Sequence, residues 1–252
     1  MLALPLQDKI VLVTGAGSGL GRATALLAAA QGARLLLADI DEAGGNETQR
    51  RVSETGAEAQ FVRADVSMAE DAKAMVASCI QIFGRLDCAV NNAGVLGAKA
   101  PIAEYDIDEW HRIIAINLTG VFLSMRYEIP AMLQGGSGSI VNIGSTASLG
   151  GRPEMAAYAA TKHAVVGLTR SAAMEYGPRN IRVNCIMPGS FATPMSASAL
   201  EGEGAEKMMQ NTPLRRIAAA DEIAQSIVWL CSEAASFVTG ASLSVDGGKR
   251  AG

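Results

Sequence analysis

Cysteine and histidine are scarce in this sequence, and each shortage argues against a class of site. The cysteines stand far apart, and no two of them form a C-x-x-C pair. Neither a zinc site nor a disulfide framework is therefore expected, and the thiols should be small buried side chains in a reducing compartment. His163 is expected to be a packing or interface residue rather than a base, and His111 receives no role. We expect no metal site. The four cysteines are Cys79, Cys88, Cys185 and Cys231.

Long apolar runs and an excess of basic charge are also missing. No apolar stretch approaches the ~20 residues that a membrane-spanning helix needs. The N-terminal segment lacks a basic beginning, and the pair Asp8-Lys9 interrupts its apolar run, so it does not resemble a signal peptide. The chain has 21 basic and 25 acidic residues, a net charge of −4, which gives no reason to expect nucleic-acid binding. We expect a cytoplasmic protein without membrane or nucleic-acid partners.

Short apolar runs alternate with longer alanine-rich segments of helical period along the whole chain. Continuous runs such as IVLVT and LLLAD are typical of parallel strands that helices cover on both faces. The alternation predicts one α/β domain over residues 1–252, a doubly wound Rossmann-type fold with seven parallel strands. Residues 190–213 are expected to form a flap over a site. Ser67-x-x-Glu70 is interpreted as a capping box that opens a helix. The expected strands are Ile10–Thr14, Arg34–Asp39, Ala59–Arg63, Asp87–Asn91, Ser139–Ile143, Arg182–Met187 and Ser242–Val245.

A glycine-rich loop follows the first of these strands and precedes a helical segment. Residues 14–21 read Thr-Gly-Ala-Gly-Ser-Gly-Leu-Gly, with the spacing G-x-x-x-G-x-G at Gly15, Gly19 and Gly21. Glycines let a backbone turn tightly and approach a pyrophosphate, and the helix N-terminus then points its free N–H groups at that charge. A flexible loop is the alternative. The position between strand and helix favours dinucleotide binding.

Acidic residues at the ends of the next two strands are candidates for contacts with the adenosine half of a dinucleotide. Asp39 ends the second strand, where a carboxylate can hold the ribose hydroxyls. Alternatively, Asp39 or Asp41 caps the following helix. After the third strand, Asp65 and Val66 could contact adenine, or Asp65 could be a turn residue.

Tyr158 and Lys162 are four residues apart in the segment Tyr158-Ala-Ala-Thr-Lys162, so a helix would bring them to one face. An ammonium beside a phenol is expected to lower the tyrosine pKa and to make it a proton donor or acceptor near neutral pH. Ser145 ends another strand, on the side of an open sheet where ligands bind. Its hydroxyl could bond a substrate oxygen, or it could cap a helix.

These motifs together resemble the short-chain dehydrogenase/reductase family across essentially the whole chain. The resemblance rests on TGAGSGLG (14–21), NNAG (91–94), Asn117, Ser145, YAATK (158–162) and PGSFAT (188–193), in the family's order and spacing. It implies catalytic roles for Asn117, Ser145, Tyr158 and Lys162, with Asn117 holding a water in a proton relay. NAD rather than NADP is the expected cofactor, because the NADP phosphate would meet the like charge of Asp39 and Ser18 offers no cation to offset it. The cofactor residues expected overall are Gly15, Ser18, Gly19, Leu20, Gly21, Asp39, Ile40, Asp65, Val66, Asn91, Ala93, Gly94, Tyr158, Lys162, Pro188, Gly189, Phe191 and Thr193.

The substrate is expected to be a small secondary alcohol or ketone. Stretches such as KHAVVGLTR resemble bacterial family members that act on cyclic alcohols, diols and ketones. A 3-oxoacyl-acyl-carrier-protein reductase is the enzymatic alternative, although such enzymes normally carry a basic residue where Ser18 stands. A non-catalytic NAD-sensing protein is the other alternative, and the resemblance also implies a homotetramer. No arginine is clearly poised for a carboxylate, although Arg152 could reach the mouth. The expected substrate residues are Ser145, Leu96, Leu149, Met155, Phe191 and Met195.

Overall fold

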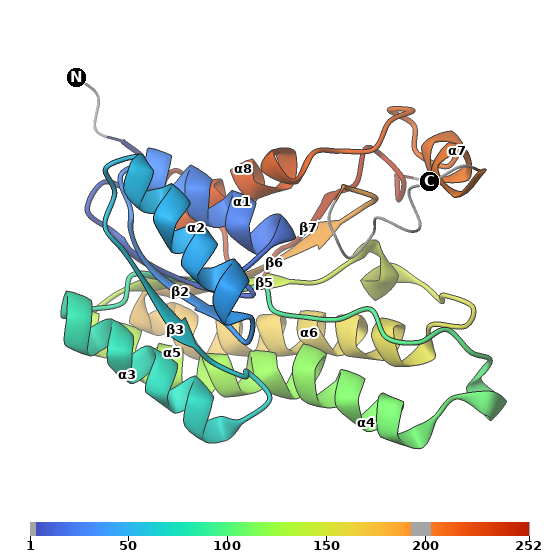
Figure 1. Cartoon of the computed structure of the whole chain (residues 1–252), viewed down its shortest axis with the longest axis horizontal. Helices are drawn as coiled ribbons and strands as arrows, with labels where there is room; N and C mark the ends of the chain where they lie inside the picture. Colours follow the sequence, from blue (N-terminus) through green and yellow to red (C-terminus); the bar gives the residue numbers. More distant parts are fainter. Residues whose placement is uncertain (1–3, 193–202, 252) are drawn as a thin grey trace.

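Seven parallel strands form one sheet at the centre of the protein (Figure 1). The computed structural model describes residues 4–192 and 203–251. The strand order is β3-β2-β1-β4-β5-β6-β7. All seven expected strands are present, with ends displaced by at most one residue. Their bounds are β1 Ile10–Thr14, β2 Arg34–Asp39, β3 Ala59–Arg63, β4 Cys88–Asn91, β5 Gly138–Ile143, β6 Ile181–Pro188 and β7 Ser242–Val245.

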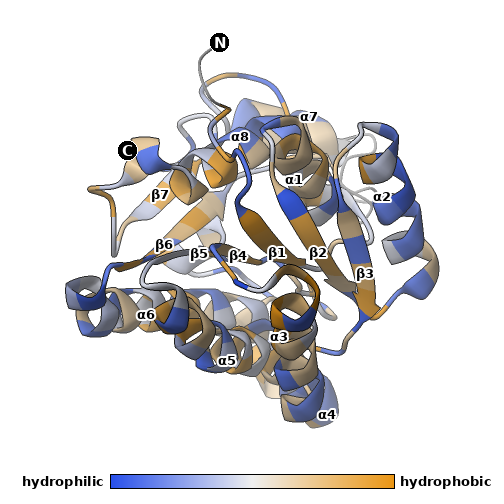
Figure 2. Ribbon diagram, turned by 90° about the vertical axis from the view of Figure 1, so that its left-hand side faces the viewer, coloured by the Kyte–Doolittle hydropathy of each residue, from blue (hydrophilic) through white to orange (hydrophobic). Residues whose placement is uncertain are grey.

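Helices cover both faces of the sheet, which confirms the doubly wound fold (Figure 2). One layer contains α1 (Gly19–Ala30), α2 (Glu42–Glu54) and α8 (Ala220–Cys231). The other contains α3 (Ala69–Phe83), α5 (Gly120–Gly135) and α6 (Ala156–Tyr176). A π-helical turn at Ala115–Thr119 joins α4 (Ile107–Ile114) to α5, and α7 spans Glu203–Gln210. Short 3₁₀ turns lie at Ile102–Glu104, Thr146–Leu149, Gly177–Arg179 and Glu233–Ala235.

The continuous apolar strands divide their side chains between two cores, one on each face. Because successive side chains of a strand point to opposite faces, odd and even positions enter different clusters. In β2, Leu35 and Leu37 pack against α1, whereas Leu36 packs on the α3 and α5 side. All three are fully buried. Complete burial of one such side chain contributes about 1.5–3 kcal/mol, so the apolar runs explain why the sheet lies at the centre.

The helix after β3 begins differently from the sequence prediction. Met68 is the N-cap of α3, and it makes no side-chain capping bond. The Ser67 hydroxyl instead donates to Asp65 Oδ1 at 2.7 Å, and the Ser67 amide donates to the same oxygen at 2.9 Å. The predicted capping box at Ser67 and Glu70 is therefore wrong, because Asp65 forms a turn that uses the serine before the helix starts.

The topology places a crevice at the carboxyl ends of the strands. From β1 the chain adds β2 and β3 on one side, and then crosses to add β4, β5, β6 and β7 on the other. At such a reversal the loops after β1 and β4 diverge, and ligands of open parallel sheets bind there. Within the described part of the chain, no helix is long and apolar enough to cross a membrane.

Candidate active site

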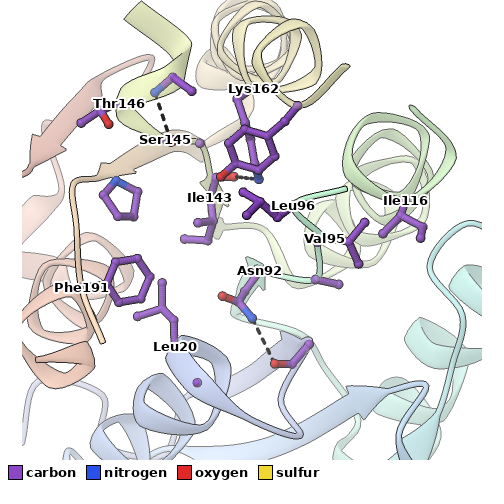
Figure 3. A pocket seen from close by; sticks show the side chains of 18 of the residues that line it. Leu20, Asn92, Val95, Leu96, Ile116, Ile143, Ser145, Thr146, Lys162 and Phe191 are labelled. Atoms are coloured by element: carbon purple, nitrogen blue, oxygen red, sulfur yellow. Dashed lines mark hydrogen bonds between the residues drawn. The ribbon is translucent and has the colours of Figure 1, made fainter. Parts of the chain in front are cut away.

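A cavity of about 550 Å³ opens at the carboxyl ends of the strands (Figure 3). The loops after β1 to β6 all contribute to its walls, so residues that are distant in sequence meet there. Most of the expected cofactor residues line it. These are Gly15, Ser18, Gly19, Leu20, Asp39, Ile40, Asp65, Val66, Ala93, Gly94, Tyr158, Lys162, Pro188, Gly189 and Phe191. Thr193 lies outside the described residues.

The glycine loop is shaped by two close approaches of its backbone. Gly15 has φ +64°, and a Cβ on it would lie 2.8 Å from the Cα of Ala93. Gly21 does not line the cavity that the described residues enclose. A Cβ there would lie 2.0 Å from the carbonyl oxygen of Gly15, so this glycine lets α1 pack against the loop. Helix α1 therefore starts directly at the cavity, and its free N-terminal N–H groups fit a bound pyrophosphate.

Two asparagines stand at the end of β4, Asn91 and Asn92. Asn92 lines the cavity. Asn92 Nδ2 donates to the carbonyl oxygens of Thr14 and Gly15 at 3.0 and 3.1 Å, which fastens the glycine loop to the end of β4. Asn91, the residue expected beside the cofactor, points to the opposite side of the strand. It is 2% exposed and does not line the cavity that the described residues form. Adjacent strand residues face opposite ways, so the cavity wall has Asn92 in the place where we expected Asn91 from the NNAG motif.

Asn91 belongs to a buried polar cluster beneath the sheet. Its Nδ2 donates to Glu128 Oε2 at 3.1 Å and to Asn142 Oδ1 at 3.0 Å, and Asn142 Nδ2 donates to Thr169 Oγ1 at 3.0 Å. Burial raises the pKa of Glu128 to about 8, because water no longer solvates the carboxylate. This cluster therefore joins β4 and β5 to α5 and α6 behind the site.

Asp39 is the last residue of β2, and it lines the cavity on the side of the glycine loop. Its Oδ2 accepts a hydrogen bond from the amide of Gly17 at 2.7 Å, and its Oδ1 accepts one from the amide of Asp41 at 2.9 Å. The helix cap is Asp41, whose carboxylate accepts from the amide of Ala43. Of the two aspartates that could cap this helix, Asp41 is the cap of α2, and Asp39 remains at the cavity wall.

Arg22, the cation nearest to the glycine loop, is bonded to residues of α2. Arg22 donates to Thr48 Oγ1 at 2.9 Å and to the carbonyl oxygen of Gly44 at 3.2 Å, and it also bonds the carbonyl oxygen of Gly17. It therefore packs against α2. Across the sheet from Asp39, Arg63 forms an ion pair with Glu42 at 3.6 Å. Both guanidinium groups near Asp39 therefore already have partners.

Asp65 is a turn residue, one of the two roles that the sequence allowed. Its Oδ1 holds the turn at Ser67, and its amide donates to Asp71 Oδ2 at 2.9 Å. Asp65 and Val66 nevertheless line the cavity. Turn formation and a contact with a bound ligand are therefore compatible at this position.

Ser145, Tyr158 and Lys162 converge on the other end of the cavity. Ser145 follows β5, and its Oγ accepts a hydrogen bond from the amide of Ala147 at 3.1 Å, so it does cap the 3₁₀ turn. Its side chain also acts on the phenol of Tyr158, whose pKa would be higher without it. Lys162 lies one turn further along α6 with 5% exposure. Its Nζ donates to the carbonyl oxygen of Ile143 at 2.8 Å (Figure 3).

The protonation of this group differs from the sequence prediction. Burial raises the pKa of Tyr158, and the hydrogen bond from Ser145 and the charge of Arg152 only partly oppose it. The expectation of a lowered tyrosine pKa is wrong for this structure, because desolvation of the phenolate outweighs these two effects. Burial also lowers the pKa of Lys162 to about 8. Lys162 Nζ lies 5.7 Å from the centre of the Tyr158 ring.

Asn117 lies behind the cavity in the π-helical turn between α4 and α5. It is fully buried, and its side chain is engaged with Val95. Its Oδ1 accepts from the Val95 amide at 2.8 Å, and its Nδ2 donates to the Val95 carbonyl at 2.7 Å. A Cβ on Gly94 would lie 3.1 Å from Asn117 Oδ1 and 3.7 Å from Lys162 Nζ, so the three residues are neighbours. π-Helical turns are frequent at functional sites.

The expected substrate residues are only partly brought together. Leu96, Met155 and Phe191 line the cavity with Ser145. Leu149 turns toward solvent at the end of the 3₁₀ turn, where it is 46% exposed. Met195 lies outside the described residues, as does part of the expected flap. Sequence reasoning also passed over Asn92, although it belongs to the NNAG motif. It missed further lining residues that no motif marks: Lys99, Ile116, Thr146 and Lys249.

Comparison with known proteins agrees with this geometry. The family model described as "Enoyl-(Acyl carrier protein) reductase" matches residues 15–250. The chain is 44% identical over 246 residues to 2,5-dichloro-2,5-cyclohexadiene-1,4-diol dehydrogenase of Sphingobium indicum, covering 96% of this chain and 97% of the relative. It is 42% identical over 241 residues to cyclohexanol dehydrogenase of an Acinetobacter species, covering 96% and 94%.

Solved structures agree as well. The crystal structure of levodione reductase superposes with a TM-score of 0.95 at 40% identity, covering 98% of this chain and 99% of that one. Other similar structures contain bound NAD⁺ or NADP. The glycine loop, the start of α1 and the convergence of Ser145, Tyr158 and Lys162 fit a nicotinamide dinucleotide in this cavity. The chain belongs to the short-chain dehydrogenase/reductase family, as an oxidoreductase that interconverts alcohols and carbonyl compounds with NAD or NADP.

Proposed function

We propose that this enzyme oxidises cyclic secondary alcohols, and reduces the matching ketones, with NAD(H). The observation that carries the proposal is the meeting of Ser145, Tyr158 and Lys162 in a cavity whose other end carries the dinucleotide loop. The names of two relatives at 42–44% identity point to six-membered rings as the substrate skeleton. Leu96, Met155 and Phe191 offer apolar contacts to such a ring.

Tyr158 acts as the acid in ketone reduction and as the base in alcohol oxidation. The bound cofactor supplies or accepts the hydride, and the protein moves the proton and orients the substrate. The phenol gives its proton to the carbonyl oxygen as the new C–H bond forms, and it takes the hydroxyl proton in the reverse direction. Because Ser145 and Tyr158 line the same end of the cavity and the serine acts on the phenol, a substrate oxygen placed between the two groups can contact both.

Lys162 supports this proton transfer from behind. Its hydrogen bond to the Ile143 carbonyl fixes the ammonium beside the tyrosine ring, where its charge stabilises a phenolate as it forms. With a pKa of about 8, Lys162 can also exchange a proton with water near neutral pH. In the relay that family resemblance implies, Asn117 holds the water that receives this proton.

Asp39 makes NAD the preferred cofactor. The two amides that bond its carboxylate leave lone pairs for two ribose hydroxyls. The additional phosphate of NADP would bring like charge against this carboxylate and would remove a donor. NADP enzymes offset that phosphate with Arg or Lys, whereas Arg22 is bound to α2 and Arg63 is paired with Glu42.

The enzyme assembles as a homotetramer in which α6 packs against its symmetry mate. Three residues on the exposed face of α6 recur every seven positions: Ala160, Gly167 and Met174. Gly167 has nothing near the position of a Cβ, and Met174 is 83% exposed. A stripe of small residues with an exposed methionine suits close packing of two helices in a closed two-fold interface.

The catalytic proposal is tested with Tyr158→Phe, assayed for NADH formation from cyclohexanol and NAD. The ring is kept and the transferable proton is lost, so we expect the rate to fall ~10²–10⁴-fold. NADH binding, followed by its fluorescence, should persist. Tyr176→Phe is the matched control, since it removes a hydroxyl ~27 Å further along the same helix. Near-normal turnover of Tyr158→Phe would contradict the assignment.

A further inference from the structure

The substrate end of the cavity carries a concentration of positive charge that the apolar walls do not account for. Lys99, Arg152 and Lys249 line the cavity, and Arg250 lies next to them. They come from three segments: the loop after β4, the segment between β5 and α6, and the segment after β7. Among residues 4–192 and 203–251, none of these four cations forms an ion pair with a carboxylate.

The two arginines are held beside the catalytic serine. Arg152 Nη2 donates to Thr146 Oγ1 at 2.9 Å, and Arg250 Nη2 donates to the Thr146 carbonyl oxygen at 3.2 Å. Thr146 directly follows Ser145, and the two residues are neighbours on one wall of the cavity (Figure 3). The charge of Arg152 also acts on the Tyr158 phenol, where it offsets part of the rise in pKa that burial causes. The positive charge therefore lies near the reacting atoms.

Lys249 has no partner for its charge within the described structure. Its Nζ makes no hydrogen bond to any described residue, and the side chain is half-buried. Burial lowers its pKa, and repulsion from Arg152 and Arg250 adds to the effect. Asp246 is the one acidic group whose charge acts to raise the pKa of Lys249. That carboxylate accepts from the Gly248 amide at 2.9 Å through Oδ1, and its Oδ2 is buried without a described partner.

This charge does not belong to the cofactor's phosphates in the arrangement described above. The pyrophosphate fits the glycine loop and the start of α1, and the adenosine end is marked by Asp39. Arg152 and Arg250 are instead bonded to Thr146 beside the catalytic serine, and Lys249, the residue before Arg250, lines the same cavity. A partly desolvated ammonium next to two guanidinium groups is destabilised by their mutual repulsion, and a bound anion would relieve it.

We propose that the substrate carries a carboxylate on the ring that bears the reacting hydroxyl or ketone, and that Lys249 and Arg152 bind this carboxylate. The proposal rests on the dehydrogenase function proposed above and names its substrate class as cyclic hydroxy acids and oxo acids. Lys249 supplies a movable point charge, and Arg152 supplies a planar pair of N–H donors. Lys99 and Arg250 add to the local positive potential that draws the acid to the mouth.

The test compares kcat/KM for 2-, 3- and 4-hydroxycyclohexanecarboxylate, their methyl esters and cyclohexanol, with NAD as cofactor. We expect at least one acid to exceed its own ester by tenfold or more. In Lys249→Met, which keeps the length of the side chain, this acid-to-ester ratio should fall toward one. Added salt should lower the ratio in the wild type, because it screens the attraction. Lys73→Met is the control, since it removes the same charge from the exposed face of α3.

The possible failures are distinguishable. If no alcohol in the set is oxidised, the proposed function itself fails. If acids and esters are oxidised equally well by the wild type, the enzyme is a dehydrogenase and the carboxylate site is wrong. If Lys249→Met raises the KM for NAD while the acid-to-ester ratio stays unchanged, the cation serves the cofactor's phosphates. An acid preference that persists in both Lys249→Met and Arg152→Leu would also overturn the assignment.

Discussion

Replacing Glu128 by glutamine should stabilise this protein at neutral and alkaline pH. Glu128 is fully buried on α5, and one carboxyl oxygen accepts a hydrogen bond from Asn91 Nδ2 at 3.1 Å. The other oxygen has no hydrogen-bond partner among the described residues. Burial raises the pKa of the carboxyl to about 8. The folded protein therefore keeps Glu128 protonated at neutral pH, whereas the unfolded chain ionises it.

The magnitude follows from the two pKa values. The group ionises near 4.5 in the unfolded chain and near 8 in the folded protein. Between these values the folded state binds one more proton than the unfolded state, so the free energy of unfolding falls as the pH rises. The loss is about 1.4 kcal/mol per pH unit, and it approaches ~5 kcal/mol above pH 8. Glutamine does not titrate, and it avoids this loss.

Urea unfolding followed by circular dichroism, at one fixed protein concentration, measures the effect. The difference between Glu128→Gln and wild type should grow by roughly 1 kcal/mol or more per pH unit between about pH 5.5 and 8, and then level off. Glu175→Gln serves as the control, because Glu175 is exposed on α6. A difference that does not change with pH would refute the reasoning, since it would show that Glu128 ionises normally in the folded state.

Three further predictions concern cofactor, proton transfer and assembly. The wild type should prefer NAD over NADP by at least ~10-fold in kcat/KM, and Asp39→Ala should reduce this preference. Equal kcat/KM with both cofactors in the wild type would contradict the role of Asp39. Because burial raises the pKa of Tyr158, alcohol oxidation should accelerate with rising pH and ketone reduction should slow, whereas matching pH profiles in both directions would contradict this assignment. Light scattering at micromolar concentration should give about four times the mass of one chain, and Gly167→Trp should reduce that mass. A monomer would exclude the tetramer.

The fold was largely predictable because its strands are buried on both faces. The interiors of β1 and β2, IVLV and LLLA, contain only apolar residues, and polar or charged residues stand at their ends. Local bonding was harder to predict. The Ser67 cap failed because a competing acceptor, Asp65, lies two residues earlier, and sequence spacing does not tell which of two short-range bonds forms.

Site residues that belong to a sequence motif could be predicted. Site residues that reach the cavity from segments without a motif could not. Tyr158, Lys162 and the glycine loop are recognisable from short spacings. Lys249 lies more than 80 residues beyond Lys162 in a segment with no motif. Its position in the cavity follows only from the packing of β7 beside β6. Whether the pKa of Tyr158 is raised or lowered also depends on how deeply the phenol is buried, and sequence spacing does not give this burial.

The strand order separates the choice of cofactor from the choice of substrate. Asp39 ends β2 and Ser145 follows β5, and two strands, β1 and β4, lie between them. At ~4.8 Å per strand the two strand ends are ~14 Å apart, beyond the 7–10 Å within which substitutions usually influence one another. Lys249 follows β7, which lies still further from β2 than β5 does, so changes at Asp39 and at Lys249 should combine additively in the logarithm of kcat/KM. Cofactor preference and substrate preference could then be redesigned, or could diverge in evolution, one at a time.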